Sequence, residues 1–255
     1  MVLVSQRSTP CEPNPNAYHD DNSEESNETD VREYRQMVGS LVYAMTSTRP
    51  DLSYCITKLS QHLAKPQKGD WIMLKHVFRY IKQTIDYGLT YRKSESDLKL
   101  LAYCDADWGA AVEDRRSISG YCISLTKSGP PISWKSRKQT SVALSTCEAE
   151  YMSISITCQE IIYLTQLLRD IEPSREPIPA IIRNDNQGAI ALVKNPVKHT
   201  RSKHIDIRYH FIRDCYNENK VTLEYVPTNM NISDLFTKPP KRDTLKLFHK
   251  FLFGQ

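Results

Sequence analysis

Apolar residues recur at helical spacing over the stretch that follows residue 30. The runs VREYRQMVGSLVYAMT and WIMLKHVFRYIKQTI place apolar side chains three and four positions apart, a pattern that predicts amphipathic helices. The triplet Arg49-Pro50-Asp51 lies between the two runs and favours a turn. Residues 31–93 are therefore predicted to form a helical segment.

The pattern changes after the polar sequence KSESD. The runs LKLLAYC, SISGYCISL and PISWKS predict three strands, and the short connections between them favour antiparallel neighbours. A long helix is predicted over about residues 146–169. The runs AIIRN, NQGAIALVK, HIDIRYHFIRDCYNEN, VTLEYV and NISDLFTK then predict strand, helix, helix, strand and helix. This order predicts an α/β fold with a mixed five-stranded sheet flanked by helices, preceded by the small helical subdomain.

Charge is unevenly distributed along the chain. Residues 1–30 carry seven acidic side chains and one basic one, and they lack apolar periodicity, so we expect a disordered acidic tail. The remainder carries 33 basic and 23 acidic residues. This basic excess indicates either a polyanionic partner such as nucleic acid or a surface that keeps the protein in solution.

Cysteine content and hydropathy bear on location. The seven cysteines are odd in number and form no Cys-x-x-Cys pair, which is typical of reduced thiols inside a cell. No apolar run approaches the ~20 residues of a membrane span, and we see no signal-peptide pattern. We therefore expect an intracellular protein, cytoplasmic or nuclear, that is not secreted and has no membrane partner.

Two aspartates end the first predicted strand. In the sequence YCDADWGA, Asp105 and Asp107 are one residue apart. Because strand side chains alternate between faces, the two carboxylates point the same way and repel each other. A bound cation is the simplest compensation for this repulsion, so the strand end is a candidate metal site.

Two glutamates lie near the start of the long predicted helix. Ser145 and Glu148 fit a capping box, in which Glu148 reaches back to the Ser145 amide from a solvent-exposed face. Glu150 instead lies on the stripe that should pack on the sheet, where a carboxylate is costly unless another charge compensates it. Glu150 is therefore the better candidate ligand, and Glu148 is interpreted as the cap.

Two further aspartates lie at the start of predicted helices. Asp185 follows the AIIRN strand, and Asp234 opens the helix in NISDLFTK. Each could serve only as a local helix cap, which is a common role for aspartate. In a sheet of this kind, however, polar sites collect at the carboxyl ends of the central strands. This rule favours a shared site for Asp105 and Asp185.

Six motifs run almost continuously from about residue 98 to 240: YCDADWGA, RRSISGYCISL, ISWKSRKQTSVALSTCEAEY, DNQGAIALVKNP, RSKHIDIRYHFIRD and VPTNMNISDLFTKP. Together they resemble the ribonuclease H domain at the end of copia-type retrotransposon Pol polyproteins. We therefore assign residues 97–240 to a ribonuclease H-like domain and residues 241–255 to a C-terminal tail. Residues 34–91 resemble the thumb or connection region that lies upstream in those polyproteins, after the polymerase palm. The loop VPTNMNISD lacks the histidine of cellular ribonucleases H, and the chain has no Tyr-x-Asp-Asp hairpin of a polymerase.

The resemblance implies a metal-dependent endonuclease that hydrolyses the RNA strand of RNA–DNA hybrids during reverse transcription. Its implied catalytic groups and metal ligands are Asp105, Glu150, Asp185 and Asp234. Two Mg²⁺ or Mn²⁺ ions are the implied cofactors, since oxygen ligands suit hard cations. The implied partners are the hybrid itself and a reverse transcriptase polymerase domain.

Further residues could support the ligands or contact the substrate. These candidates are Asp107, Trp134, Lys135, Arg137, Lys138, Asn186, Gln187, Lys203 and Arg208. Trp134 could equally pack on the core, and Asn186 and Gln187 could only start a helix. Two alternatives to the hybrid nuclease stay open at this point. One is a catalytically idle or domesticated nucleic-acid-binding remnant of a Pol protein, and the other is a nuclease of the same fold with a different substrate preference.

Overall fold

The structure, a computed structural model, describes residues 7–14, 18, 28–93, 98–111, 114–126, 129–174, 178–195 and 203–254, without the side chains at 28–29, 203–207 and 209. Contacts divide the chain into two compact units. Unit 1 comprises Met1–Tyr91 and Lys238–Gln255, and unit 2 comprises Arg92–Thr237. In the ranges described, no helix is both long and apolar enough to cross a membrane.

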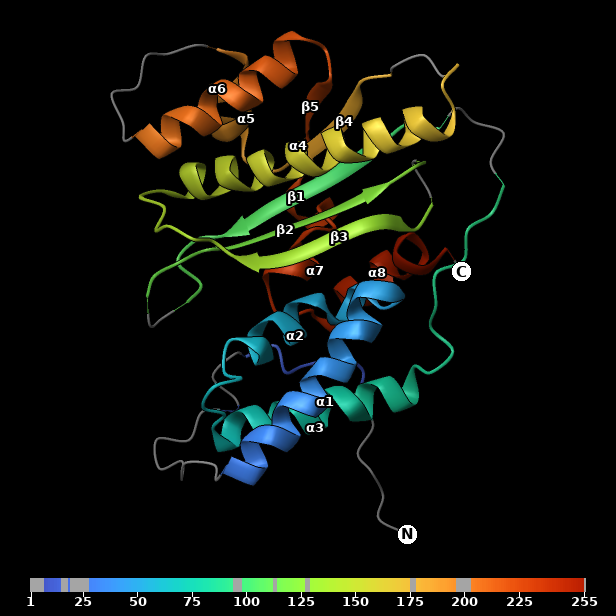
Figure 1. Cartoon of the computed structure of the whole chain (residues 1–255), viewed down its shortest axis with the longest axis vertical. Helices are drawn as coiled ribbons and strands as arrows, with labels where there is room; N and C mark the ends of the chain where they lie inside the picture. The colour runs from blue at the N-terminus through green and yellow to red at the C-terminus, as the bar shows by residue number, and fades with distance from the viewer. Residues whose placement is uncertain are drawn as a thin grey trace. The chain divides into compact units, whose positions relative to one another are not determined.

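Unit 2 is built on a mixed five-stranded sheet (Figure 1). Its strands are β1 Leu101–Asp107, β2 Ile118–Ser124, β3 Pro131–Lys138, β4 Ala180–Asn184 and β5 Val221–Tyr225. They lie in the order β3-β2-β1-β4-β5, so β1 is the central strand. The β1–β2 and β2–β3 pairs are antiparallel, and the β1–β4 and β4–β5 pairs are parallel. The mixed sheet predicted from the sequence is confirmed.

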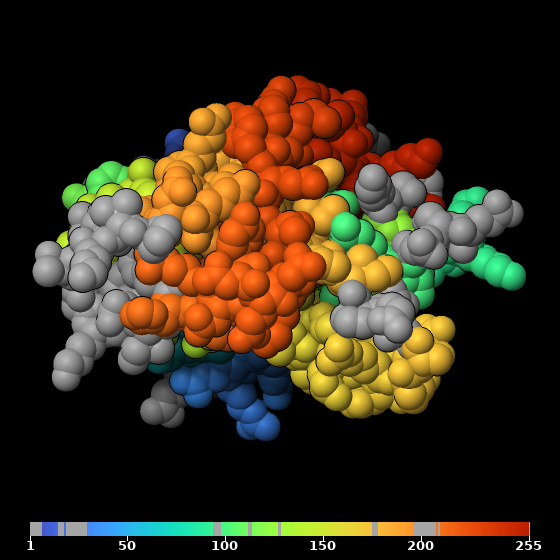
Figure 2. Space-filling model, turned by 90° about the horizontal axis from the view of Figure 1, so that it is seen from above, coloured from blue at the N-terminus to red at the C-terminus, as the bar shows by residue number. Residues whose placement is uncertain are grey.

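Helices cover both faces of this sheet. They are α4 Thr146–Ile171, α5 Gln187–Lys194, α6 Lys203–Asn217 and the short α7 Asp234–Thr237, which follows the 3-10 turn η3 Thr228–Met230. α4 packs on β1, β2 and β4, and α5 and α6 pack against α4. α7 packs on β1, β2 and β3 from the other side of the sheet (Figure 1). The space-filling view shows α6, in orange, exposed on the surface of unit 2 (Figure 2).

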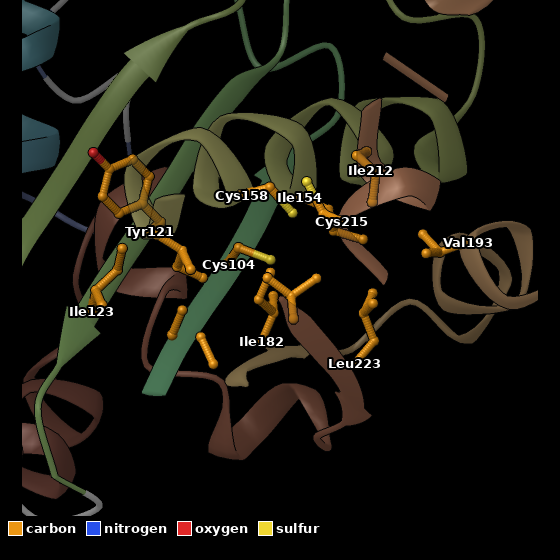
Figure 3. Close-up of a cluster of buried hydrophobic side chains, with 14 of the residues drawn as sticks. Cys104, Tyr121, Ile123, Ile154, Cys158, Ile182, Val193, Ile212, Cys215 and Leu223 are labelled. Carbon is orange, nitrogen blue, oxygen red and sulfur yellow. The ribbon is translucent and has the colours of Figure 1, made fainter. Parts of the chain in front are cut away.

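The main core of unit 2 lies between the sheet and the helices α4, α5 and α6. Cys104 and Ile182 from the sheet and Ile154 from α4 belong to it, and all three are 0% exposed (Figure 3). Burying an isoleucine side chain stabilises a fold by about 1.5–3 kcal/mol, so this core holds the end of β1 firmly. Because Cys104 faces the core, the next residue, Asp105, faces the opposite side, where α7 lies.

Unit 1 is helical, in agreement with the prediction for residues 31–93. Its elements are α1 Glu28–Ser47, η2 Pro50–Leu52, α2 Ser53–Ser60, α3 Lys68–Gln83 and α8 Arg242–Phe253. α8 corrects the expectation of a C-terminal tail over residues 241–255. Leu245, Phe248 and Leu252 recur at helical spacing and are buried, so the segment packs as an amphipathic helix.

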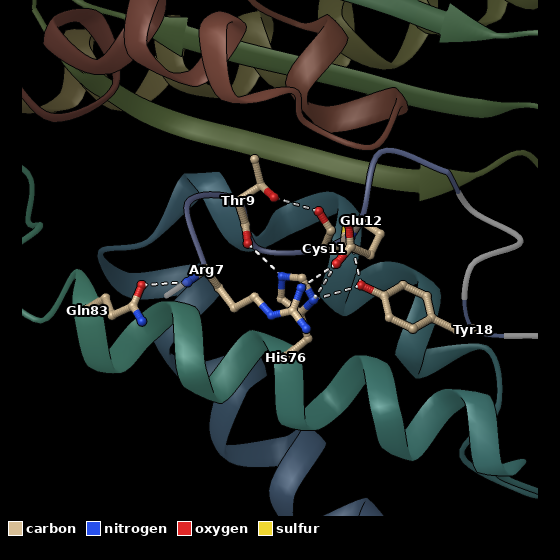
Figure 4. A network of polar contacts seen from close by, with 7 residues as sticks. All are labelled: Arg7, Thr9, Cys11, Glu12, Tyr18, His76 and Gln83. Carbon is tan, nitrogen blue, oxygen red and sulfur yellow. Dashed lines mark hydrogen bonds and ion pairs between the residues drawn. The ribbon is translucent and has the colours of Figure 1, made fainter. Parts of the chain in front are cut away.

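The expectation of a disordered tail over residues 1–30 is wrong for the part that the structure describes. His76 of α3 donates from Nε2 to the Thr9 carbonyl (2.9 Å) and accepts at Nδ1 from the Tyr18 hydroxyl (3.0 Å; Figure 4). Cys11 is 1% exposed beside them. These buried contacts fix residues 7–14 and 18 on α3, although their polar composition favours disorder. Residues 28–30 belong to α1, and the other residues before 28 lie outside the described ranges.

Candidate active site

Asp105 is positioned by the central strand and by a glycine next to it. Asp105 is 1% exposed, and its partner on β2 is Gly120. A Cβ atom on Gly120 would lie 2.6 Å from Phe236 Cβ and 2.8 Å from Thr237 Cγ2. Only glycine therefore lets α7 approach β2 this closely. The approach brings α7 within reach of Asp105.

Three carboxylates converge at the end of β1. One oxygen from each of Asp105, Asp185 and Asp234 lies within 4.8 Å of the other two. They come from β1, from the residue that follows β4, and from the first residue of α7. Three negative charges this close together repel one another unless a cation or protons compensate them. The structure thus brings together three of the four residues that the sequence predicts as ligands.

Hydrogen bonds tie the surrounding segments to β1. The side-chain amides of Asn184 and Asn231 each donate to the Cys104 carbonyl at 3.1 Å, and both residues are buried. Asn231 also accepts a hydrogen bond from Ser233 Oγ at 2.5 Å, next to Asp234. Sequence reasoning misses these residues because their partners lie 80 and 127 positions away. No local pattern distinguishes them from ordinary loop asparagines.

Glu150 lies beside the three aspartates but is not one of the mutually close group. Glu150 is 6% exposed, and its carboxylate accepts a hydrogen bond from Asn184 Nδ2 at 2.8 Å. Burial and the charges of Asp105 and Asp185 together raise the pKa of Glu150 to about 9, against the opposing effect of the Asn184 bond. A cation at the site would favour the ionised form of Glu150.

Glu148 caps α4, with two differences from the expectation. Ser145 Oγ accepts from the Glu148 amide at 3.2 Å, as a helix cap requires. The Glu148 carboxylate, however, accepts from the Leu144 amide at 2.9 Å rather than from Ser145. It is also buried, at 4% exposed, rather than solvent-exposed. The loop before α4 folds over the first turn of the helix, which the capping-box pattern alone does not reveal.

Asp185 is not the N-cap of α5, although its position just before that helix suggests this role. The N-cap of α5 is Asn186, whose Oδ1 accepts from the Ala189 amide at 2.9 Å. Asn186 therefore starts the helix, and the exposed Gln187 is its first residue. Asp185 is left to join the carboxylate group. The chain thus uses adjacent residues for the cap and for the candidate site.

The two other candidates near β1 lie outside the carboxylate group. Asp107 is half-buried at the end of β1. Trp134 is half-buried on β3, paired with Cys122 of β2, a position that fits packing on the sheet. A different tryptophan, Trp108, is 51% exposed and donates from Nε1 to the Ala143 carbonyl at 2.9 Å. The sequence shows that Trp108 directly follows β1, but it does not show that the side chain is exposed.

Basic residues gather at one cavity of unit 2. The cavity has a volume of about 180 Å³ and is lined by Arg137, Lys138 and Arg208, among other residues. Lys138 forms an ion pair with Asp114 at 2.9 Å. Two lining atoms, Arg208 Nη1 and Gln139 Oε1, are buried without a hydrogen-bond partner among the described residues. The exposed Lys135 is not among the residues that line the cavity, and the Lys203 side chain lies outside the described residues.

The donor set of the carboxylate group fits a hard divalent cation. Its three ligating groups are all carboxylates, and no histidine or cysteine of the described ranges joins them. Oxygen-only ligands suit Mg²⁺ and Mn²⁺ better than zinc. Asp105, Asp185 and Asp234 are therefore the residues that would hold such an ion.

The chain is similar in sequence to parts of two plant retrotransposon polyproteins. A retrovirus-related Pol polyprotein from transposon RE2 of Arabidopsis thaliana is 40% identical over 221 residues, which cover 87% of this chain and 15% of that protein. A Pol polyprotein from transposon TNT 1-94 of Nicotiana tabacum is 37% identical over 214 residues, which cover 84% of this chain and 16% of that protein.

No protein-family model matches the chain. Among solved structures, LC11-RNase H1 isolated from compost is similar with a TM-score of 0.42 and 14% identity, over 55% of this chain and 92% of that one. The resemblance noted in the motifs is matched by sequence identity to the RE2 relative over 87% of this chain. The chain is thus homologous to a part of copia-type retrotransposon Pol polyproteins, and it spans 15% of the length of the RE2 relative.

Proposed function

We propose that unit 2 is a ribonuclease of the ribonuclease H type that hydrolyses the RNA strand of RNA–DNA hybrids with two Mg²⁺ or Mn²⁺ ions. The observation that carries the proposal is the convergence of Asp105, Asp185 and Asp234 within 4.8 Å at the end of the central strand. Similarity to retrotransposon Pol polyproteins supports it, because reverse transcription leaves RNA–DNA hybrids. In the longer polyprotein, a polymerase domain would be the partner that makes these hybrids.

The carboxylates have distinct roles in this proposal. Asp105, Asp185 and Asp234 hold the ions, and Thr237 orients Asp105 through a hydrogen bond to its Oδ2. Glu150 completes the site from α4, held by Asn184. Bound divalent ions supply the activation of water and the stabilisation of the leaving oxygen in phosphodiester hydrolysis. The protein contributes position and charge, which is most of what this chemistry requires.

The basic cavity supports a contact with the substrate backbone. Arg208 Nη1 is a buried donor without a partner in the described part of the chain, and Arg137 lies beside it in the same cavity. A buried unsatisfied donor is costly, and a phosphate oxygen would satisfy it. We assign this cavity to a phosphate of the bound hybrid. Recognition of the RNA strand itself would rest on its 2′-hydroxyl groups.

Two rival functions predict different results. A catalytically idle nucleic-acid-binding remnant would bind hybrids without cleaving them, and a related nuclease would prefer duplex DNA or duplex RNA. The four intact acidic residues argue against the idle remnant. We also propose an intracellular location, supported by the seven free cysteines.

Cleavage of end-labelled substrates by the whole chain tests the proposal. The substrates are an RNA–DNA hybrid, duplex RNA and duplex DNA, each in Mg²⁺, Mn²⁺ or EDTA. We expect cleavage of the hybrid RNA strand alone, dependent on the metal, and its loss in the Asp185→Asn variant. Binding measured by fluorescence anisotropy in Ca²⁺ accompanies each reaction. Tight hybrid binding with no cleavage in any metal would instead favour the idle remnant.

A further inference from the structure

Unit 1 contains a cavity that the proposed nuclease function does not use. It lies among the N-terminal segment, α3 and its following turn, and α8, and has a volume of about 480 Å³. Its lining includes three cationic side chains, Arg7, Arg242 and Lys246, and three aromatic ones, Tyr80, Tyr87 and Phe253. Ligand pockets commonly have volumes of about 300–1,000 Å³, so the cavity is large enough for a small organic molecule.

The charge of the lining is unbalanced. Arg7 is paired with Glu12 at 2.5 Å. Arg242 and Lys246, both exposed on the first two turns of α8, form no ion pair with any residue that the structure describes. No carboxylate lines the cavity within the described ranges. The mouth of the cavity is therefore positive and attracts an anion.

Two buried nitrogen atoms of the lining have no hydrogen-bond partner in the ranges that the structure describes. Arg7 Nη1 donates to Glu12, and the Arg7 backbone amide donates to Gln83 Oε1 at 2.7 Å. Arg7 Nε is buried and has no hydrogen-bond partner among the described residues. His249 Nε2 is likewise buried without a hydrogen-bond partner in the described part of the chain. Native proteins rarely leave such atoms unpaired. Oxygen atoms of an anionic ligand would supply acceptors for both.

The tyrosine wall of the cavity, formed by Tyr80 and Tyr87, is held in place by contacts within the protein before any ligand binds. Arg49, 5% exposed, forms a two-point ion pair with Asp51, at 2.9 and 2.7 Å, and donates to the Thr84 carbonyl at 3.1 Å. The Tyr80 hydroxyl donates to the same Asp51 at 2.8 Å. The Arg49 guanidinium also lies 5.7 Å from the centre of the Tyr87 ring. A wall fixed in this way loses little entropy when a ligand binds.

We propose that this cavity binds a nucleoside phosphate, with the phosphate at Arg242, Lys246 and Arg7 and the base against the tyrosine wall. A phosphate alone would leave most of 480 Å³ unfilled, whereas an uncharged ring would leave the cations without an acceptor. Basic side chains combined with aromatic ones are the usual means of holding nucleotides of single strands. The ligand is either a free nucleotide or the phosphorylated end of a single strand. The site is independent of the carboxylate group in unit 2.

Calorimetric titration of the whole chain tests the proposal. The probes are AMP, adenosine, inorganic phosphate and a 5′-phosphorylated DNA tetranucleotide, all in EDTA so that no metal bridges them to the aspartates. We expect AMP to bind, with adenosine and inorganic phosphate at least tenfold weaker, because each lacks one half of the recognition. Tetranucleotide binding as tight as that of AMP identifies a strand end, and much weaker binding identifies a free nucleotide.

Charge variants of α8 separate a specific site from general attraction. Arg242→Gln and Lys246→Gln should each weaken AMP binding by about tenfold, because each removes a charged contact to the phosphate. The matched control is Lys250→Gln, which removes the same charge from an exposed position of α8 outside the cavity lining and should bind AMP like the wild type. The proposal is overturned if AMP releases no heat, or if Lys250→Gln weakens binding as much as Arg242→Gln. Melting temperatures of the variants verify that each one is folded.

Discussion

The hydroxyl of Thr237 donates a hydrogen bond to Oδ2 of Asp105, although 132 positions separate the two residues. Both side chains are buried. The bond fixes one oxygen of Asp105 and leaves the carboxylate oriented toward Asp185 and Asp234. A helix of four residues therefore contributes twice to the site, with a carboxylate at its first residue and a hydroxyl at its last.

Replacing Thr237 by valine should impair both the fold and the site. Valine has the shape of threonine but cannot donate, so a buried carboxylate loses a charge-assisted hydrogen bond. We expect the free energy of unfolding to fall by about 1–3 kcal/mol and metal-dependent cleavage to fall with it. Thr237→Ser keeps the hydroxyl and should retain most activity. Urea unfolding and single-turnover cleavage measure the two effects, and equal activity in both variants would contradict the proposed role of the hydroxyl.

Replacing Gly120 by alanine should displace α7. The new Cβ would lie 2.6 Å from Phe236 Cβ, so the helix must move. Overpacking of this kind costs about 1–3 kcal/mol, and the shift would also separate Asp234 from Asp105. We expect Mg²⁺ to raise the melting temperature of the wild type and to have a much smaller effect on the variant.

An exposed glycine provides the control for this experiment. A Cβ on Gly39 of α1 would meet no atom of the described residues within 4 Å. Gly39→Ala should therefore stabilise the protein by about 0.5–1 kcal/mol, because alanine favours a helix, and should leave the response to Mg²⁺ unchanged. A Gly120→Ala variant with a wild-type response to Mg²⁺ would show that α7 need not pack so closely.

Local pattern was sufficient to predict the elements and most of the carboxylate group. The apolar run AIIRN coincides with β4, and the periodicity of residues 146–169 predicts α4 to within two residues of its end. Asp105 and Asp185 follow from the rule that polar sites lie at the ends of central strands. In such cases the signal lies within a few neighbouring residues.

The contributions that the sequence does not reveal depend on distant partners. Thr237 and Asn231 act on β1 only because Gly120 lets α7 approach, and no short window contains all these residues. Cys11 is buried because His76 binds the segment around it, against a polar composition that favours disorder. α8 is a different case, since its apolar periodicity is present in the sequence and contradicts the expectation of a tail.

Replacing Glu150 by glutamine should abolish cleavage while stabilising the metal-free protein. With the pKa of Glu150 raised to about 9, the folded chain keeps a proton that the unfolded chain releases above its ordinary value of about 4.3. Wild-type stability therefore falls as the pH rises between these values. Glutamine does not titrate, so its advantage in EDTA should be larger at pH 8 than at pH 5. Melting temperatures at the two pH values measure this difference.

Glu148 provides the matched comparison on the same helix turn. Glutamine can still accept from the Leu144 amide, so Glu148→Gln should cleave the hybrid like the wild type. Glu148→Ala should lower the free energy of unfolding by about 0.5–2 kcal/mol, the usual cost of losing a helix cap, with activity per folded molecule retained. An inactive Glu148→Gln beside an active Glu150→Gln would reverse the two assignments.

Acid should destabilise unit 1 through His76. Burial lowers the pKa of His76. The charges of Arg7 and Arg79 act in the same direction, and the hydrogen bond to the Thr9 carbonyl and the charge of Glu12 oppose them. The unfolded chain takes up a proton on this residue near pH 6.5, whereas the folded chain resists protonation, so stability is present above that pH and is lost as the pH falls through it. His76→Gln keeps a donor for the Thr9 carbonyl but cannot titrate. The free energy of unfolding should therefore drop more between pH 7.5 and pH 5.5 for the wild type than for the variant, and equal drops would show that His76 is not the group responsible.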